Sequence, residues 1–242
     1  MKRLLLIPIC ISVSVLMTSC YFESWDSGVE GNGNVTEEIR DLDGFTGLHI
    51  SSGIDVYMSQ DSRYSVKVVA DENLMDIIKT EIKGGILEVG VEKPGIRRAK
   101  SKKVTVSLPE LDRLKISSAG DCIGETPFNC KDLDINISSA GDLMLEVYAD
   151  RIKLNISSSG DAKLSGEVND FDASLSSAGD LEAYDLIAKK AKVSVSSAGN
   201  ARVYATEELN MSTSSAGNIY YRGDAKVVRS STSSAGNIVN KN

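Results

Sequence analysis

Apolar and polar residues alternate on both sides of a pentapeptide that occurs seven times in the last 126 residues of the chain. Copies of Ser-Ser-Ala-Gly-Asp begin at Ser117, Ser138, Ser157, Ser176, Ser196, Ser214 and Ser233; Ser159 replaces one Ala, and the last three copies end in Asn. The starts lie 21, 19, 19, 20, 18 and 19 residues apart. Such a near-constant period is typical of stacked repeats, in which neighbouring units complete one another's core.

The alternation predicts strands on either side of each copy. The residue just before the copy is apolar in the first five, at Ile116, Ile137, Ile156, Leu175 and Val195, and apolar residues resume just after it, from Cys122 and Leu143 to Ile219 and Ile238. The outward positions nearest the copy are Lys, Asn and Ser, with few acids grouped together. Period-two alternation is typical of half-buried strands. We therefore predict a regular parallel β-solenoid over residues 111–242, with coils of strand, tight corner, strand and variable return.

Glycine and the acidic or amide residue suit the corner. Glycine is expected to supply a positive φ there, and Asp or Asn to bond the backbone of its own turn. In register, Asp121, Asp142, Asp161 and Asp180 stack at steps of about 5 Å, followed by Asn residues. Stacked carboxylates can hold a cation such as calcium between coils. Alternatively each faces water, and the change to Asn favours this second interpretation, so no metal or other cofactor is expected.

The preceding part, residues 31–110, is predicted to be irregular β structure. His49-Ile50-Ser51-Ser52-Gly53-Ile54-Asp55-Val56 resembles a degenerate copy of the repeat unit, and residues 64–70, 86–91 and 104–108 alternate as strands. Between the first two strands we predict one short helix, capped by Asp71 and ended by Gly84-Gly85, with Leu74, Ile77, Ile78 and Ile82 on one face.

Several motifs of this part resemble the GIN domain, a bacterial domain of unknown function labelled as an auto-transporter adhesin head. They are Gly-x-Gly-Asn at 31–34, Phe45 before a strand, Ser52-Gly53 with Asp55, Ala-Asp-Glu-Asn-Leu at 70–74 and the glycine before Leu87. The resemblance covers residues 31–240 and implies a right-handed parallel β-solenoid (β-helix). It also implies a lipoprotein of Bacteroides-like bacteria, and it carries over no catalytic residues.

The N-terminus is predicted to be a targeting segment. Lys2 and Arg3 precede an apolar run at 4–17 and then Thr18-Ser19-Cys20. This order is typical of a secretory signal peptide over residues 1–19, and the run is short for a membrane span. It resembles a bacterial lipobox, which would place a lipid on Cys20 and a flexible tether at 20–30; Met17 departs from the usual Leu. The alternative is an ordinary secreted protein with a spare thiol.

The net charge limits the classes of binding partner, and the cysteine content limits the possible disulfides. The net charge of −7 becomes −9 without residues 1–19, which carry two cations and no acid. A negative chain argues against nucleic acid and against electrostatic attachment to anionic lipid. With Cys10 in the signal and Cys20 acylated, Cys122 and Cys130 remain; they could form a disulfide in an oxidising compartment or be two small buried residues.

Catalytic patterns are weak, whereas one aromatic and charged surface follows the repeats. His49 is the only histidine, with no Ser-His-Asp or Cys-His arrangement around it, and we interpret it as a satisfied strand residue. Two adjacent outward lines after the copies carry a set that we call the tyrosine–arginine patch: Glu182, Tyr184, Arg202, Tyr204, Tyr220 and Arg222. Such residues suit sugar stacking or protein contact, although tyrosine is also common on β surfaces.

These observations favour a non-catalytic binding or adhesion lipoprotein of the cell envelope, at the outer membrane, either periplasmic or surface-exposed, with a glycan or protein ligand. A structural protein that assembles through solenoid sides or ends is the alternative, and a carbohydrate-active β-helix enzyme is a third reading. Thr213, Thr232 and Ser230 replace apolar residues near the C-terminus, and a polar last coil is typical of a cap. We therefore expect a monomer or weak dimer.

Overall fold

The computed structural model describes residues 28–242. The signal segment, the lipidation residue Cys20 and most of the tether lie outside the described residues. Within residues 28–242, no helix is both long and apolar enough to cross a membrane.

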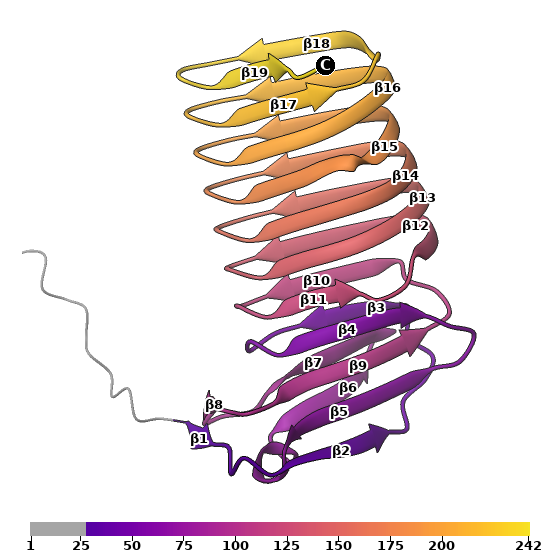
Figure 1. Ribbon diagram of the computed structural model, residues 1–242, viewed down its shortest axis with the longest axis vertical. Helices are drawn as coiled ribbons and strands as arrows, with labels where there is room; N and C mark the ends of the chain where they lie inside the picture. Colours follow the sequence, from indigo (N-terminus) through magenta and orange to yellow (C-terminus); the bar gives the residue numbers. More distant parts are fainter. Residues whose placement is uncertain (1–27) are drawn as a thin grey trace, which may run out of the picture.

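The described chain is almost entirely β-strand, stacked along one long axis (Figure 1). Its N-terminal part contains β1 (Val29–Glu30), β2 (Val35–Arg40), β3 (Gly47–Ile50), β4 (Asp55–Gln60), β5 (Ser65–Asp71), the 3₁₀ helix η1 (Glu72–Leu74), β6 (Ile78–Lys83), β7 (Ile86–Val91), β8 (Ile96–Arg98) and β9 (Lys102–Leu108). The coils continue through β10 (Arg113–Ser117), β11 (Asp121–Gly124), β12 (Phe128–Ser138), β13 (Asp142–Ile156), β14 (Asp161–Leu175), β15 (Asp180–Val195), β16 (Asn200–Thr213), β17 (Asn218–Arg222), β18 (Lys226–Thr232) and β19 (Asn237–Asn240).

Each coil has two faces joined by a tight corner at the Ser-Ser-Ala-Gly sequence. The pre-corner face holds the residues that lead into the corner, and the post-corner face those that follow it. β10 pairs in parallel with β12 on the pre-corner face, matching Ile116 with Ile137, and β11 pairs with β13 on the post-corner face, matching Asp121 with Asp142. The long strands β13 to β16 cross from one face to the other at the bends on the right of Figure 1. The predicted parallel β-solenoid of about seven coils is confirmed.

The core is a single column between the two faces. The apolar positions that flank the corners are buried through most of the stack, from Ile116 and Cys122 to Ile219. The polar Thr213 is buried among them because its hydroxyl donates to the carbonyl of Gly217 at 2.7 Å. Only the last coil departs from this pattern, since Ser230 and Thr232 are exposed.

The corner glycine has a different role from the one predicted. In every corner the positive φ belongs to the second serine, for example 67° at Ser158 and 72° at Ser177, and not to the glycine. The glycine is buried under the neighbouring coil. A Cβ on Gly160 would lie 2.6 Å from Ile137 Cγ2 and 3.0 Å from the Gly141 carbonyl oxygen. Glycine is therefore required by close packing of successive coils.

The degenerate repeat near residue 51 also forms a coil. β3 pairs in parallel with β10, and β4 pairs in parallel with β11. Ser52 has a φ of 62°, as the second serine has in the regular corners. The stack thus extends below residue 111.

The N-terminal end is closed by antiparallel strands. β6 pairs with β7, and β5 pairs with both β9 and β2, while β7 and β9 pair in parallel with β3 and β4. A separate two-stranded sheet joins β1 to β8.

The predicted helix is largely wrong. Only the three residues of η1 are helical, and Ile78 and Ile82 belong to strand β6. Asp71 does not cap η1. Its buried carboxylate instead accepts the backbone amides of Lys100 at 3.1 Å and Ser101 at 3.2 Å, and these bonds, that of Lys100 first, lower its pKa.

Candidate binding surface

An Asp/Asn ladder runs along the post-corner face beside the corners. Its members pair in register in successive coils: Asp121, Asp142, Asp161, Asp180, Asn200, Asn218 and Asn237. Asp161 Oδ1 accepts the backbone amide of Asp180 at 3.0 Å, and Asp180 Oδ1 accepts that of Asn200 at 3.0 Å. The carboxylates of Asp161 and Asp180 therefore bond the next coil, and not their own turn as predicted. Asn218 and Asn237 bond both the previous coil and their own corner.

The carboxylate part of this ladder is under electrostatic strain. Partial burial raises the pKa of Asp142, and the flanking carboxylates Asp161 and Asp121 raise it further. Among residues 28–242, no group of three or more His, Cys, Asp or Glu side chains is arranged to hold a metal ion. The carboxylates of the ladder act as hydrogen-bond acceptors, as the bonds to Asp161 and Asp180 show.

The tyrosine–arginine patch lies beside the last Asp and Asn positions. Glu182, Arg202 and Tyr220 are paired in register, as expected, and Tyr204 is paired with Arg222. Tyr184 leaves the register at a bulge but returns to the patch through Arg222, whose guanidinium lies 4.2 Å from the centre of the Tyr184 ring. A second group is centred on Arg202, which lies 3.6 Å from Glu182 and 5.5 Å from the centre of the Tyr220 ring.

A groove connects this patch with the Asp/Asn ladder. It encloses about 440 Å³ and is lined by all four ladder carboxylates together with Met144, Lys163, Glu182 and Arg202. Met144 is 53% exposed, so the groove also offers an apolar contact. Cation–π contacts hold Arg222 against Tyr184 and Arg202 against Tyr220 before a ligand arrives. Together they make a preformed surface of acceptors, guanidinium donors and phenol hydroxyls.

The pre-corner face carries two ladders of alternating charge. The first charged ladder runs Asp132, Arg151, Asp170, Lys190, Glu208 and Lys226. The second charged ladder runs Arg113, Asp134, Lys153, Asp172, Lys192, Asn210 and Arg229. Both border a hollow of about 720 Å³ whose floor includes Ile152, Phe171 and Ala191.

Ion pairs connect neighbouring coils within the charged ladders. Arg151 Nε lies 2.6 Å from Asp132 Oδ1, and Lys192 Nζ lies 2.9 Å from Asp172 Oδ2. The bond from Arg151 lowers the pKa of Asp132. The outward position nearest each corner carries mostly Asn and Ser, and gives no sign of this alternation. The same alignment, extended two and four residues further back, contains the alternation.

A match to one family model, over most of the chain, shows the family to which this protein belongs. The family model "Putative auto-transporter adhesin, head GIN domain" matches residues 44–225, which include β3, β4 and six of the seven Ser-Ser-Ala-Gly corners. The chain belongs to the GIN-domain family. None of the curated proteins matches this GIN domain significantly.

Solved structures share the fold of this GIN domain. A putative adhesin from Bacteroides fragilis has a TM-score of 0.82 and 21% identity, over 88% of this chain and 100% of that one. A putative adhesin from Parabacteroides merdae has a TM-score of 0.72 and 22% identity, over 89% and 100%. A putative lipid binding protein from Parabacteroides distasonis has a TM-score of 0.72 and 24% identity, over 87% and 99%.

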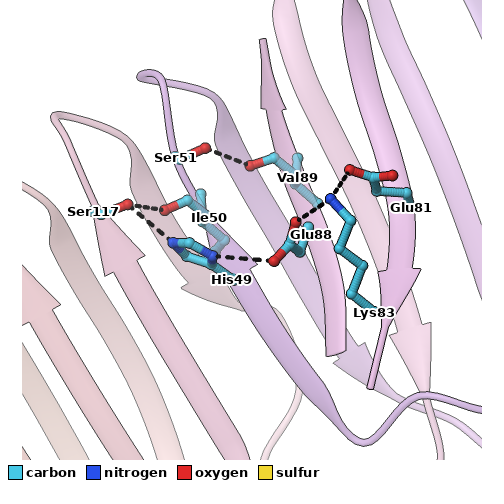
Figure 2. A network of polar contacts seen from close by, with 8 residues as sticks. All are labelled: His49, Ile50, Ser51, Glu81, Lys83, Glu88, Val89 and Ser117. Carbon is cyan, nitrogen blue, oxygen red and sulfur yellow. Dashed lines mark hydrogen bonds and ion pairs between the residues drawn. The ribbon is translucent and has the colours of Figure 1, made fainter. Parts of the chain in front are cut away.

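His49 of the GIN domain lies in a polar network between the first coils (Figure 2). Its Nε2 lies 3.2 Å from Ser117 Oγ, and its Nδ1 lies 3.8 Å from Glu88 Oε1. Sequence reasoning missed this grouping because Ser117 and Glu88 reach His49 only through the register of three coils. The Ser117 hydroxyl also donates to the carbonyl of Ile50 at 3.2 Å, and Glu88 is bonded to Lys83.

The environment of His49 favours the neutral imidazole. Burial lowers its pKa first, and the charge of Lys115 lowers it further. Because the serine hydroxyl and the carboxylate both have other partners, the network in Figure 2 connects coils, as the interpretation of His49 as a satisfied strand residue requires.

The two cysteines that the structure describes are both free. Cys122 is buried in the core with its Sγ 3.8 Å from Met58 Sδ, and burial raises its pKa. Cys130 is half-buried; burial and then the charge of Asp112 raise its pKa to about 11. Both thiols are therefore protonated and poorly nucleophilic at neutral pH.

Proposed function

We propose that this GIN-domain protein is a non-catalytic binding or adhesion module of the cell envelope, tethered by a lipid on Cys20. Its ligand site is the tyrosine–arginine patch together with the adjoining groove, and its ligand is a neutral, hydroxyl-rich glycan. The observation that carries this proposal is the continuity of the two features, since Glu182 and Arg202 belong to both.

The chemistry of the site supports a glycan ligand. Carboxylates and phenol oxygens accept hydrogen bonds from sugar hydroxyls, guanidinium edges donate to sugar oxygens, and Met144 provides an apolar contact. The four ladder carboxylates repel anionic polymers, and the chain's net charge of −7 argues against nucleic acid. The contacts that order the patch also reduce the entropy lost on binding.

A glycan array followed by titration calorimetry tests the ligand class. We expect neutral oligosaccharides to bind and their sulfated counterparts to bind more weakly. Replacing two patch residues, Arg202→Ala and Tyr204→Ala, should weaken binding roughly tenfold or more. Lys190→Ala on the pre-corner face is the matched control. Equal losses in patch and control variants, or a preference for sulfated glycans, would contradict the proposal.

The lipid anchor has its own test. The order of basic, apolar and small residues before Cys20 supports acylation at that position. Cys20→Ala should move the protein from the membrane fraction to the soluble fraction, whereas Cys10→Ala should leave the distribution unchanged. Retention of the Cys20→Ala protein in membranes would contradict the anchor without affecting the glycan site.

A further inference from the structure

The C-terminal end of the solenoid presents two strands with open edges. β18 pairs only with β16, and β19 pairs only with β17; no other strand of residues 28–242 pairs with either one. They form the uppermost coil in Figure 1. Every residue of β18 is exposed, including Val227 at 39% and Val228 at 56%. An edge strand with exposed apolar residues is a template for a further strand.

The two charged ladders end on this edge with the same sign. The first ends at Lys226, above Glu208, and the second at Arg229, above Asn210. Arg229 therefore has no acid below it, and neither cation has an ion pair with the described part of the chain. Within the stack, each coil that carries two cations in these ladders is faced by a coil that carries two aspartates. The aspartates flank an apolar residue, as in Asp132-Leu133-Asp134 and Asp170-Phe171-Asp172. If the alternation of charge continued, a strand added to β18 would carry an acidic residue in each ladder.

We propose that the end formed by β18 and β19 is a docking surface for a strand of a partner protein that carries two acidic residues flanking an apolar one. The strand adds to β18 in parallel, as each coil adds to the one before it. Its acids pair with Lys226 and Arg229, and its apolar residue covers Val227 and Val228. Main-chain hydrogen bonds supply affinity, and the two charges select the partner.

A second copy of this chain fits the surface less well. Two copies meeting at their C-terminal ends would place Lys226 and Arg229 of each against the same cations of the other, and like charges on facing strands repel. At the opposite end, the acids of edge strand β2 already have partners: Glu37 lies 3.3 Å from Lys67, and Glu38 lies 3.2 Å from Arg40. The charges therefore favour a different, acidic strand.

Matched peptides test the proposal on the mature chain carrying Cys20→Ala. The probe is a fluorescein-labelled peptide of residues 168–175, which contains Asp170-Phe171-Asp172, and its control has both aspartates replaced by lysine. We expect the acidic peptide to bind roughly tenfold more tightly by fluorescence anisotropy. Its amide NMR shifts should be confined to β18, β19 and the coil beneath. Equal affinity of the two peptides, shifts elsewhere, or no binding at millimolar peptide would overturn the proposal.

A charge reversal on the protein provides the second test. Lys226→Glu with Arg229→Glu alters two exposed side chains, so the fold should be preserved, with a slightly lower melting temperature because residue 226 faces Glu208. The preference between the peptides should then invert. If the double variant still prefers the acidic peptide, the charges do not select the strand. Self-association of the unmodified protein in sedimentation, relieved by the acidic peptide no better than by its control, would assign the edge to a second copy instead.

Discussion

At the scale of single residues, each corner combines a strained serine with a buried glycine. The second serine takes the left-handed conformation, which costs a non-glycine residue about 1–2 kcal/mol. The glycine two residues later has no such φ but lies against the coil beneath. Sequence reasoning assigned both properties to the glycine, because the alignment gives residue types but not the contacts between coils.

Two substitutions in one corner separate these roles. Gly160→Ala should destabilise the fold by about 1–3 kcal/mol, because its Cβ would overlap Ile137 Cγ2. Ser158→Gly should change the stability by less than about 1 kcal/mol, since relief of strain is offset by the entropy of the unfolded chain. Urea unfolding measures both. If Ser158→Gly proved the more damaging, the assignment of packing to glycine would be wrong.

The stacked carboxylates give the protein a specific response to pH. Because the folded-state pKa of Asp142 is raised, the folded protein binds more protons than the unfolded chain between the ordinary value of 3.8 and that raised value. Stability should therefore increase as pH falls through this window. Asp142→Asn should remove this trend and stabilise the neutral-pH protein by about 0.5 kcal/mol, since it relieves like charges on facing strands.

Asp71 provides the matched comparison for that experiment. Its pKa is lowered, so its contribution is present above 3.8 and lost as pH falls through the folded-state value. Asp71→Asn should therefore reduce stability at neutral pH and flatten acid denaturation. Melting temperatures from pH 3 to 7 record both variants. If melting temperature depended on pH with the same slope in both variants, the opposite directions of the pKa shifts of Asp142 and Asp71 would be wrong.

At the scale of strands, the charged ladders balance each coil against its neighbours. Lys192 stands between Asp172 and Asn210, and Lys190 between Asp170 and Glu208. Facing opposite charges contribute about 0.2–1 kcal/mol per pair, and facing like charges destabilise by similar amounts. The ladders thus add modest stability and strong preference for one register.

Reversing a single position of the second charged ladder tests this balance. Lys192→Asp faces Asp172 and should lower stability by about 1 kcal/mol. Lys189→Asp, on an exposed position outside both ladders, makes the same charge change as a control. Denaturant melts at low and high salt should show the difference shrinking as salt screens it. A difference that is independent of salt would point to packing in place of charge.

The strands at the N-terminal end show where periodicity fails. Leu74, Ile77, Ile78 and Ile82 share a helical face, but Ile78 and Ile82 equally fit one side of a strand. The hairpin wins because Gly84 and Gly85 both take positive φ and return the chain to β7. A single sequence pattern satisfied both periods, and only pairing with β7 decided between them.

At the scale of the whole molecule, the repeats predicted the stack but not its N-terminal end. Regular spacing shows which positions of each coil point inward and which point outward, and that successive coils are alike. The core residues and most residues of the tyrosine–arginine patch could therefore be predicted from the sequence. Pairings such as Val35 with Asp71 are antiparallel and have no repeat to reveal them. The position of Tyr184 was also unpredictable, because a bulge in β15 shifts it out of register.

The last coil should keep the isolated protein dispersed. β18 and β19 cover Leu209, Met211 and Ile219, which are buried beneath them. Removing residues 223–242 should expose these side chains together with new strand edges and cause aggregation. Light scattering of the full mature chain carrying Cys20→Ala is the control. A truncated protein that stays monodisperse at high concentration would show that the last coil is no cap.

The alternation of sign from coil to coil also constrains how such a chain can change in length. Excising residues 142–160 removes one coil and places Asp132 and Asp134 directly against Asp170 and Asp172. Excising residues 142–179 removes two coils and places the same aspartates against Lys190 and Lys192. Loss or duplication of an even number of coils should therefore preserve the facing opposite charges, whereas an odd number should place like charges together. The electrostatic repeat of this solenoid is a pair of coils of opposite sign, twice the period visible in its corners.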